Sequence, residues 1–389
     1  MTSPEEKGGR KAKPESRSPQ TLPETPDTAI AGKLKTLLDG PWEPVKDNIR
    51  EQLNREEALP MIEGSIEEIR AALLEKVKMV ATSGMMQTAF SKANGGSGEA
   101  HVGILGLDLL GQFNGSLAIK SGVQFGLWGG AVDVLGTERH REYAQGAMDL
   151  SMLGSYGMTE RGHGSNVQDL ETTATYDPET KEFVINTPTP SATKVYIGNT
   201  ARDGRWSAVF AQLYTPGEQE SHGVHCFVVR IREDDGSPVE GVTIGDHGHK
   251  GGLLGVDNGT LTFDNVRIPR EALLNQFGDV DEEGNYTSPI ESKNRRFFTM
   301  LGTLIRGRIA VGAAGAGATK SALAIAVKYA HQRRQFDYGD TGTEDKLIDY
   351  RAHRRRLIIP LARTYALQVL QNQLTQRYAD QTSRQATGC

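Results

Sequence analysis

Residues 154–177 read GSYGMTERGHGSNVQDLETTATYD, and the character of this stretch changes half-way along. Its first half is a loop in which glycines alternate with hydrogen-bonding side chains: Tyr156, Thr159, Glu160, His163, Ser165 and Asn166. Glycine lets the backbone turn and approach a flat ligand closely. The second half is rich in threonine and ends at the Asp177–Pro178 turn, which predicts a β-strand. Such a loop is typical either of the edge of a cofactor site or of a well-capped surface loop, and the residue types alone leave both open.

The chain before this stretch has a helical pattern from residue 31 to about residue 150. Ser65 and Glu68 have the spacing of a capping box, and apolar residues follow at helical intervals. The glycine-rich portion at 103–130 predicts closely packed helices with interspersed turns. Three of its side chains either line a tunnel for an apolar substrate or pack in an ordinary core: Gln124, Phe125 and Trp128.

From residue 151 to about residue 283 the pattern is that of short strands. Four runs are rich in Val, Ile, Phe, Thr and Tyr: 182–187, 207–214, 224–231 and 260–268. Dipeptides that end in glycine separate these runs and predict turns. The pattern indicates a small β domain, either a barrel or two packed sheets. No GxGxxG follows a strand, so a Rossmann nucleotide site is not expected.

Residues 284–389 return to a helical pattern. A long helix is expected at 304–334, and its first half is packed with alanine and glycine, which predicts close contact with neighbouring helices. A second helix is expected at 344–379, with Pro360 kinking or interrupting it. The predicted fold is therefore α+β: a helical N-terminal domain, a barrel-like β domain and the first helices of a C-terminal bundle. Residues 1–30, rich in proline, serine and mixed charge, are expected to form a disordered tail.

The composition excludes several classes of protein. A net charge of -5 gives no electrostatic basis for general nucleic-acid binding, and two cysteines cannot staple a secreted fold. The longest apolar run, 101–136, is broken by charges and glycines, so no membrane span is expected there. His247 and His249 lack a third ligand nearby, so no metal site is predicted.

The motif TERGHGSN, followed by LETTATYDPETKEF, resembles the flavin-contacting loop of the acyl-CoA dehydrogenase and oxidase superfamily. It is similar to the oxidase branch in particular, because dehydrogenases usually have Thr-Glu-Pro followed by Gly-Ser-Asp here. The resemblance covers roughly residues 99–370 and implies two helical domains that sandwich a β domain around FAD. The activity it implies is oxidation of an acyl-CoA to a trans-2-enoyl-CoA in fatty acid β-oxidation, with electrons passed to O2 to give hydrogen peroxide. An acyl-CoA dehydrogenase that uses an electron-transfer flavoprotein and a non-catalytic fragment that binds flavin or acyl-CoA are the alternatives.

The resemblance also implies which residues contact the ligands. The flavin ring would be contacted by five residues of the loop and of the strand that follows it: Tyr156, Met158, Thr159, Tyr196 and Gly198. In the motif YAHQRRQF, which matches a helix end that reaches into a neighbouring subunit, three residues would meet the pyrophosphate and adenosine of FAD: Arg333, Gln335 and Phe336. Contacts with the acyl-CoA are implied for three more: Gly164, Ser165 and Arg308.

Residue chemistry alone allows an ordinary role for several of these positions. Thr159 is compatible with a cap, Tyr196 with a buried strand end, and Arg308 with a salt bridge at the edge of the core. Arg333 and Arg334 are compatible with a solvated helix end. Asp337 follows Phe336 where family members usually have glycine.

No catalytic base is predicted within the chain. In the oxidases the catalytic glutamate lies well downstream of the YAHQRRQF helix, in a segment that these residues do not reach. Some dehydrogenases carry the base immediately before the arginine matched by Arg308, but Gly307 stands there and cannot abstract a proton. We therefore expect either the front portion of a longer, C-terminally truncated oxidase or a shortened relative that cannot complete the reaction.

The resemblance finally implies assembly and location. A homodimer is expected for the full-length protein. The expected location is the peroxisome in a eukaryote and the cytoplasm in a bacterium. The first thirty residues show no targeting signal.

Overall fold

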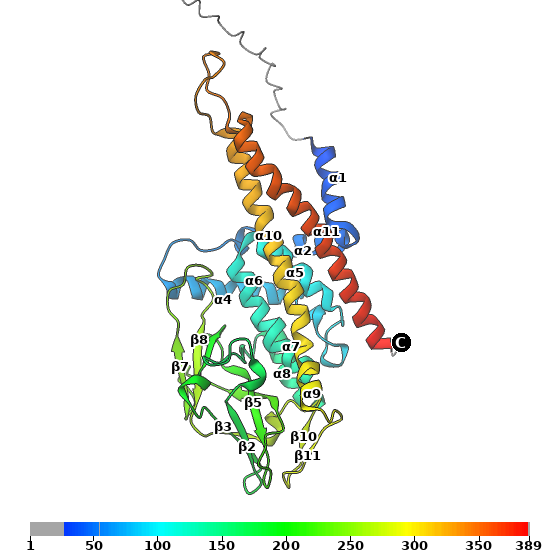
Figure 1. Cartoon of the computed structure of the whole chain (residues 1–389), viewed down its shortest axis with the longest axis vertical. Helices are drawn as coiled ribbons and strands as arrows, with labels where there is room; N and C mark the ends of the chain where they lie inside the picture. Colours follow the sequence, from blue (N-terminus) through cyan, green and yellow to red (C-terminus); the bar gives the residue numbers. More distant parts are fainter. Residues whose placement is uncertain (1–26, 54, 388–389) are drawn as a thin grey trace, which may run out of the picture.

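The computed structural model describes residues 27–53 and 55–387, which form helices, then β-sheets, then helices. Figure 1 shows the β-sheets at one end and two long helices that extend past the other elements at the opposite end. This order confirms the predicted α+β fold. The first 26 residues of the predicted tail lie outside the described residues. For its last residues the prediction was wrong, since a helix begins at Thr28. Asp27 caps this helix, because its carboxylate accepts hydrogen bonds from the backbone amides of Ala29 and Ile30.

The N-terminal part is helical, as predicted, and its helices are α1 (Thr28–Asp39), α2 (Glu43–Gln52), α3 (Arg55–Ala58), α4 (Ile66–Thr82), α5 (Ala100–Phe113), α6 (Gly115–Ser121), the π-helical turn η4 (Gly122–Trp128), α7 (Gly129–Leu135) and α8 (Arg141–Asp149). The capping box at the start of α4 is confirmed, since Ser65 and Glu68 bond to each other's backbone amides. Helix α5 is apolar and buried over most of its length, because the neighbouring helices enclose it.

The β region contains three sheets rather than one closed barrel among the described residues. The first has the order β1-β5-β2-β3-β9 with β6 on β5, the second is β4-β8-β7, and β10-β11 is a hairpin. Their bounds are β1 (Gly154–Gly157), β2 (Thr173–Asp177), β3 (Glu182–Asn186), β4 (Lys194–Ile197), β5 (Trp206–Tyr214), β6 (Val224–Arg230), β7 (Val242–Asp246), β8 (Gly259–Phe263), β9 (Val266–Pro269), β10 (Asp279–Val280) and β11 (Tyr286–Thr287). Residues from the first two sheets, among them Phe183, Phe227 and Leu261, share one apolar core.

Several details of the predicted strands were wrong. The first four residues of the predicted loop, Gly154–Gly157, form strand β1, which pairs with β5. The run 260–268 is two strands rather than one, because Asn265 has a φ of 50° and turns the chain between β8 and β9. Strand β7 was missed, because its sequence VTIGD ends in residues with poor strand propensity.

The C-terminal part consists of α9 (Lys293–Leu301), α10 (Thr303–Gln332), the short turn η9 (Leu347–Asp349) and α11 (Arg351–Thr387). The last helix begins at Arg351 rather than at 344, because residues 344–346 pair with the residues that follow α10: the amide of Gln335 donates to the carbonyl of Asp345 over 3.0 Å. Pro360 lies inside α11 and does not end it. Trp42 joins α11 to the N-terminal helices, since its indole N–H donates to the carbonyl of Asn372 over 3.3 Å.

Helix α10 lies directly against α5, as its small residues predicted. A Cβ atom on Gly317 would come within 2.3 Å of the carbonyl oxygen of Asp108, and one on Gly111 within 2.7 Å of the carbonyl of Ala314. Beside this contact, the carboxylate of Asp108 pairs with Lys320 of α10 at 2.8 Å and with Lys46 of α2 at 3.2 Å. The glycines therefore allow a close approach that the buried ion pairs hold in register.

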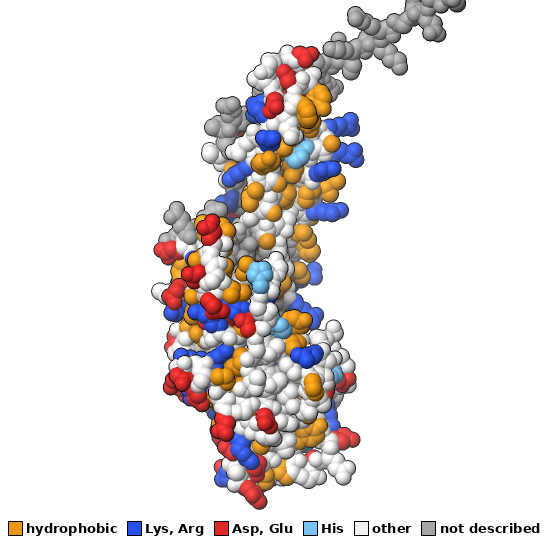
Figure 2. Space-filling view, turned by 90° about the vertical axis from the view of Figure 1, so that its left-hand side faces the viewer, with side chains coloured by type: hydrophobic (Ala, Val, Ile, Leu, Met, Phe, Trp, Pro, Cys, Tyr) orange, Lys and Arg blue, Asp and Glu red, His pale blue; other side chains and the backbone are white. Residues whose placement is uncertain are grey.

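The outer faces of α10 and α11 carry exposed apolar side chains, for example Ile325, Tyr329 and Ile358. Figure 2 shows hydrophobic side chains between basic ones on the upper part of the molecule. By length and composition alone, Lys293–Gln332 is apolar enough to cross a membrane, and 22% of its most apolar window is buried. Core helices of soluble proteins, which are mostly buried, meet the same criterion of length and composition.

We predict that Gly317→Ala destabilises the chain by about 1–3 kcal/mol, because the added methyl group would push α5 away from α10. The matched control is Gly315→Ala, two residues earlier on the same helix, where a Cβ meets nothing within 4 Å. That variant should be neutral or slightly more stable, since alanine is the better helix former. Urea unfolding followed by circular dichroism measures both, and equal effects of the two substitutions would contradict the close approach.

Candidate functional site

The polar loop after β1 lies beside strand β4. Glu160 and Lys194 form an antiparallel bridge, and the amide of Val195 donates to the carbonyl of Thr159 over 3.0 Å. Residues that are far apart in the sequence are therefore neighbours in space. Thr159 belongs to the loop segment of this pairing, and Tyr196 and Gly198 belong to the segment of β4 and the turn after it.

A buried ion pair fixes this arrangement. Lys194 Nζ lies 2.9 Å from Glu160 Oε1, both side chains are fully buried, and Nζ also donates to the carbonyls of Met158 and Phe210. Burial alone would raise the pKa of Glu160, but Lys194 and hydrogen bonds from Thr172 and from the amide of Glu171 hold that pKa below its ordinary value. Burial also lowers the pKa of Lys194 to about 8, while Glu160 favours the charged amine. At neutral pH both groups are therefore charged.

Glu160, His163 and Glu171 place three possible metal-ligand atoms within 4.8 Å of one another. Glu160 already accepts the hydrogen bonds described above, and Glu171 accepts from Ser191 and Thr189 at 2.6 Å each. His163 Nδ1 faces both carboxylates, at 3.5 and 3.7 Å. These contacts give the cluster a structural role, because they stabilise the loop. The prediction that the chain has no metal site remains a prediction.

Two residues beside the ion pair, Thr159 and Gly198, have donors that a ligand can use. Among the described residues, no group accepts a hydrogen bond from the backbone N–H or the hydroxyl of Thr159, or from the N–H of Gly198. Tyr196, between them, is 71% exposed. Free N–H and O–H donors around an exposed aromatic ring suit a flat ligand whose edge carries acceptors, as the edge of a flavin does. Tyr196 is therefore not the buried strand end that its sequence also allowed.

The other residues of the predicted flavin loop have mixed surroundings. Met158 is buried, and its carbonyl accepts from Lys194. Tyr156 is half-buried on β1 with its ring 4.9 Å from that of Phe210. Gly164 and Ser165 lie exposed at the outer end of the loop. Their predicted contacts with acyl-CoA remain predictions.

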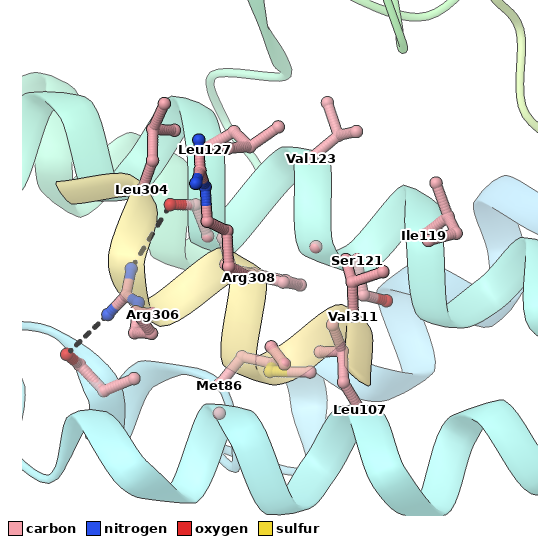
Figure 3. Close-up of a pocket in the computed structure, with 17 residues that line it drawn as sticks. Met86, Leu107, Ile119, Ser121, Val123, Leu127, Leu304, Arg306, Arg308 and Val311 are labelled. Atoms are coloured by element: carbon pink, nitrogen blue, oxygen red, sulfur yellow. Dashed lines mark hydrogen bonds between the residues drawn. The ribbon is translucent and has the colours of Figure 1, made fainter. Parts of the chain in front are cut away.

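A cavity of about 580 Å³ opens between α5, the α6–η4 segment and α10. Figure 3 shows its apolar walls, which include Leu107, Ile119, Val123, Leu304 and Val311. Phe125 also lines it, as one of the two interpretations predicted. Gln124 and Trp128 are instead core residues, because both donate to the carbonyl of Met152. The cavity has the size and polarity of a site for an apolar chain.

Two arginines of α10 line this cavity. Arg306 is engaged, since it donates to the carbonyls of Ala89 and Gly126 at 3.3 Å each (Figure 3). Arg308 is exposed and forms no ion pair or hydrogen bond with another described residue, which argues against a salt bridge at the core edge. None of the described residues that line the cavity is an aspartate or glutamate.

The predicted pyrophosphate and adenosine contacts lie elsewhere. Arg333, Gln335 and Phe336 are exposed residues of the loop that joins α10 to α11. Figure 1 shows this loop at the far tip of the long helices, away from β8, which pairs with β4. One copy of the chain thus does not bring these residues to Thr159 and Gly198.

Two family models match parts of this chain. Residues 155–266 match the model of the acyl-CoA dehydrogenase middle domain, and residues 301–388 match that of the acyl-CoA oxidase C-alpha1 domain. A peroxisomal acyl-coenzyme A oxidase 3 of Arabidopsis thaliana is 44% identical over 277 residues, which are 71% of this chain and 41% of that protein. The chain belongs to the acyl-CoA oxidase family. A peroxisomal acyl-coenzyme A oxidase 3 of Homo sapiens is 40% identical over 67% of this chain and 37% of its own length.

Solved acyl-CoA oxidase structures share the fold. Acyl-CoA oxidase 1 of Yarrowia lipolytica superposes with a TM-score of 0.79 at 32% identity, over 90% of this chain and 50% of that one. Acyl-CoA oxidase-2 of Caenorhabditis elegans, solved with FAD, ascaroside-CoA and ATP, gives 0.74 at 26% identity, over 90% of this chain and 52% of that one. The chain spans about two fifths of the length of the curated relatives it matches.

The sequence did not reveal two groups of contacts in this acyl-CoA oxidase segment. The first is the burial of Lys194 against Glu160, although a lysine in a run of strand residues is a signal for a buried partner. His247 bonds to Tyr196 from 51 residues away. No local pattern signals that contact.

We predict that Glu160→Gln lowers the free energy of unfolding at pH 7 by about 3 kcal/mol, because it leaves the buried Lys194 without its counter-charge. The pKa of Glu160 is below its ordinary value of 4.5, so its stabilising contribution is present above that pH and is lost as the pH falls through the lowered value. The difference between the native chain and the variant should therefore shrink between pH ~6 and pH ~3.

The matched control is Glu179→Gln in an exposed turn, which should leave stability unchanged. Urea unfolding across the pH range measures all three proteins. A difference between the native chain and Glu160→Gln that stays constant with pH would argue against the ionised pair.

Proposed function

We propose that this chain forms the flavin- and acyl-CoA-binding part of an FAD-dependent acyl-CoA oxidase of fatty acid β-oxidation. The observation that carries the proposal is the set of free donors on Thr159 and Gly198 around the exposed ring of Tyr196. The apolar cavity supports it, and so does the relative solved with FAD and ascaroside-CoA. When bound, FAD supplies the acceptor for the hydride from the β carbon of the substrate and passes the electrons to O2.

The chain's own residues bind and orient the ligands. Thr159 and Gly198 donate hydrogen bonds to the flavin edge, and Tyr196 covers a face of the ring. Met158 and Tyr156 shape the loop behind these donors. The apolar walls of the cavity hold the acyl chain and exclude water from it.

We assign the charged parts of the substrate to residues at the rim of the cavity. Arg308 has no anionic partner among the described residues and lies at the cavity, so it is suited to an oxygen of the thioester or of CoA. Gly164 and Ser165, in the exposed loop, border the same ligand. No carboxylate lines the cavity in the described residues, so removal of the α proton is not assigned to them.

The protein would act as a homodimer. Arg333, Gln335 and Phe336 lie at the far tip of the α10–α11 pair (Figure 1), so a second copy is needed to bring a guanidinium to the FAD pyrophosphate. The relatives from plants and humans are named peroxisomal. We place the protein in the peroxisome if its source is a eukaryote and in the cytoplasm if it is a bacterium.

We predict that Thr159→Val weakens binding of FAD roughly five- to tenfold, because valine keeps the shape of the side chain but loses its hydrogen bond. Thr175→Val on β2 is the control, since Thr175 is exposed and lies away from the loop. Titration by flavin fluorescence measures the affinity. Equal affinity of the native chain and Thr159→Val would remove Thr159 from the site.

We predict that the native chain binds acyl-CoA without bleaching the flavin under anaerobic conditions, and that Gly307→Glu gains slow bleaching. Gly307 lines the cavity, and a Cβ there meets nothing within 4 Å, so a glutamate can point a carboxylate at the substrate. Gly307→Gln is the control, because its amide cannot take a proton.

Absorbance at the flavin band follows this reaction. Peroxide released under air by Gly307→Glu would support the oxidase, and bleaching without peroxide would favour a dehydrogenase. Bleaching by the native chain would contradict the absence of a base, and no bleaching by any variant would favour a protein that only binds its ligands.

A further inference from the structure

Tyr196 sits at an irregularity in the β4–β8 pairing. Lys194 pairs with Leu261 and Ile197 with Gly259, and the register shifts between them. Tyr196 has a φ of 60°, in the left-handed region that aromatic residues rarely adopt, and the residue is exposed. Bulges of this kind re-aim a side chain and leave backbone groups without their usual partners in the sheet.

Two side chains of the loop after β7 take the place of those partners. His247 Nε2 accepts the backbone N–H of Tyr196 over 3.0 Å, and Asn258 Nδ2 donates to the carbonyl of Tyr196 over 3.0 Å. The amide of His247 in turn donates to the carbonyl of Asn258, also over 3.0 Å. Both backbone groups of the bulged residue are therefore satisfied.

The imidazole of His247 also stacks on the ring of Tyr196. The ring centroids are 4.8 Å apart and the planes are 12° from parallel. Since Tyr196 as a whole residue is still 71% exposed, the ring face that His247 does not cover is open. The histidine thus holds the strained backbone and the orientation of the ring at the same time.

The loop that carries these side chains is itself anchored. Asp246, next to His247, accepts two hydrogen bonds from the buried Arg70 of α4, at 2.5 and 2.9 Å. Lys250 Nζ donates to Asn258 Oδ1 over 2.6 Å. The position of Tyr196 therefore depends on a contact between this loop and helix α4 of the N-terminal part.

We infer that His247, together with Asn258, is a positioning residue for Tyr196. It holds the tyrosine ring at the bulge so that the ring face that His247 does not cover stacks on the flavin. This inference rests on the proposed function, because the flavin is the ligand of that face. His247 does not touch the reacting atoms, and it acts through Tyr196.

Three variants of the chain test the inference. His247→Ala removes both the acceptor and the stacked ring, and His247→Phe removes only the acceptor. His249→Ala is the matched control, since His249 is exposed on the same loop and forms no hydrogen bond or ring contact with a described residue.

Hydrogen exchange measured by mass spectrometry reports the contact without flavin. The peptide that contains Tyr196 should exchange about fivefold faster in His247→Ala and His247→Phe, because its amide has lost its acceptor. His249→Ala should match the native chain. Unchanged exchange in His247→Ala and His247→Phe would overturn the contact.

Quenching of FAD fluorescence reports whether the His247 contact positions the tyrosine ring, because a tyrosine stacked on a flavin quenches the fluorescence of the flavin. Tyr196→Leu defines the part of the quenching that comes from this ring. His247→Ala should lose at least half of that part, His247→Phe should lose less, and His247→Ala should have no further effect in the Tyr196→Leu background.

The outcomes separate the two proposals. If exchange accelerates but quenching stays native in His247→Ala, the histidine does not position the ring for the flavin, and the inference fails. If the native chain neither binds nor quenches FAD while exchange accelerates, the contact with Tyr196 stands, and both the proposed function and the role of the tyrosine toward flavin fail.

Discussion

The buried Glu160–Lys194 ion pair is the interaction on which the site depends. Thr159 directly precedes the acid, and Tyr196 follows the base two residues later, so the distance between the charges sets the distance between the two ligand-binding segments. Removing two charges from water is costly, and the chain offsets this with hydrogen bonds from Thr172 and the amide of Glu171 and with two backbone carbonyls around the amine. The loop is exposed at its tip but buried and hydrogen-bonded at its root, beside Thr159.

The cavity has a different physical origin. Glycines at the α5–α10 contact bring the two backbones together, and the ion pairs of Asp108 with Lys46 and Lys320 hold that register. The π-helical turn η4 then directs Phe125 toward the cavity, while Gln124 and Trp128 point into the core. What remains for a ligand are apolar walls and two polar side chains without a partner among the described residues, Ser121 and Arg308.

The order of helices and sheets was predictable from periodicity, turn residues and the Ser65–Glu68 capping box, because these are local signals. Strand β7 and the break at Asn265 were not, since neither has a strong local pattern. In the site, a resemblance in the loop sequence pointed to Thr159, Tyr196 and Gly198. The support of Tyr196 by His247 and Asn258 depends on the pairing of strands distant in sequence, which no pattern of spacing encodes.

The separation between the loop at 333–350 and the β-sheets has a consequence for genetics. In the proposed dimer each site takes Thr159 from one polypeptide and Arg333 from the other. Two alleles, each defective at one of these positions, would then rebuild one intact site in a mixed assembly. Such alleles would complement each other in a diploid cell, whereas two alleles altered within the loop at 158–165 would not.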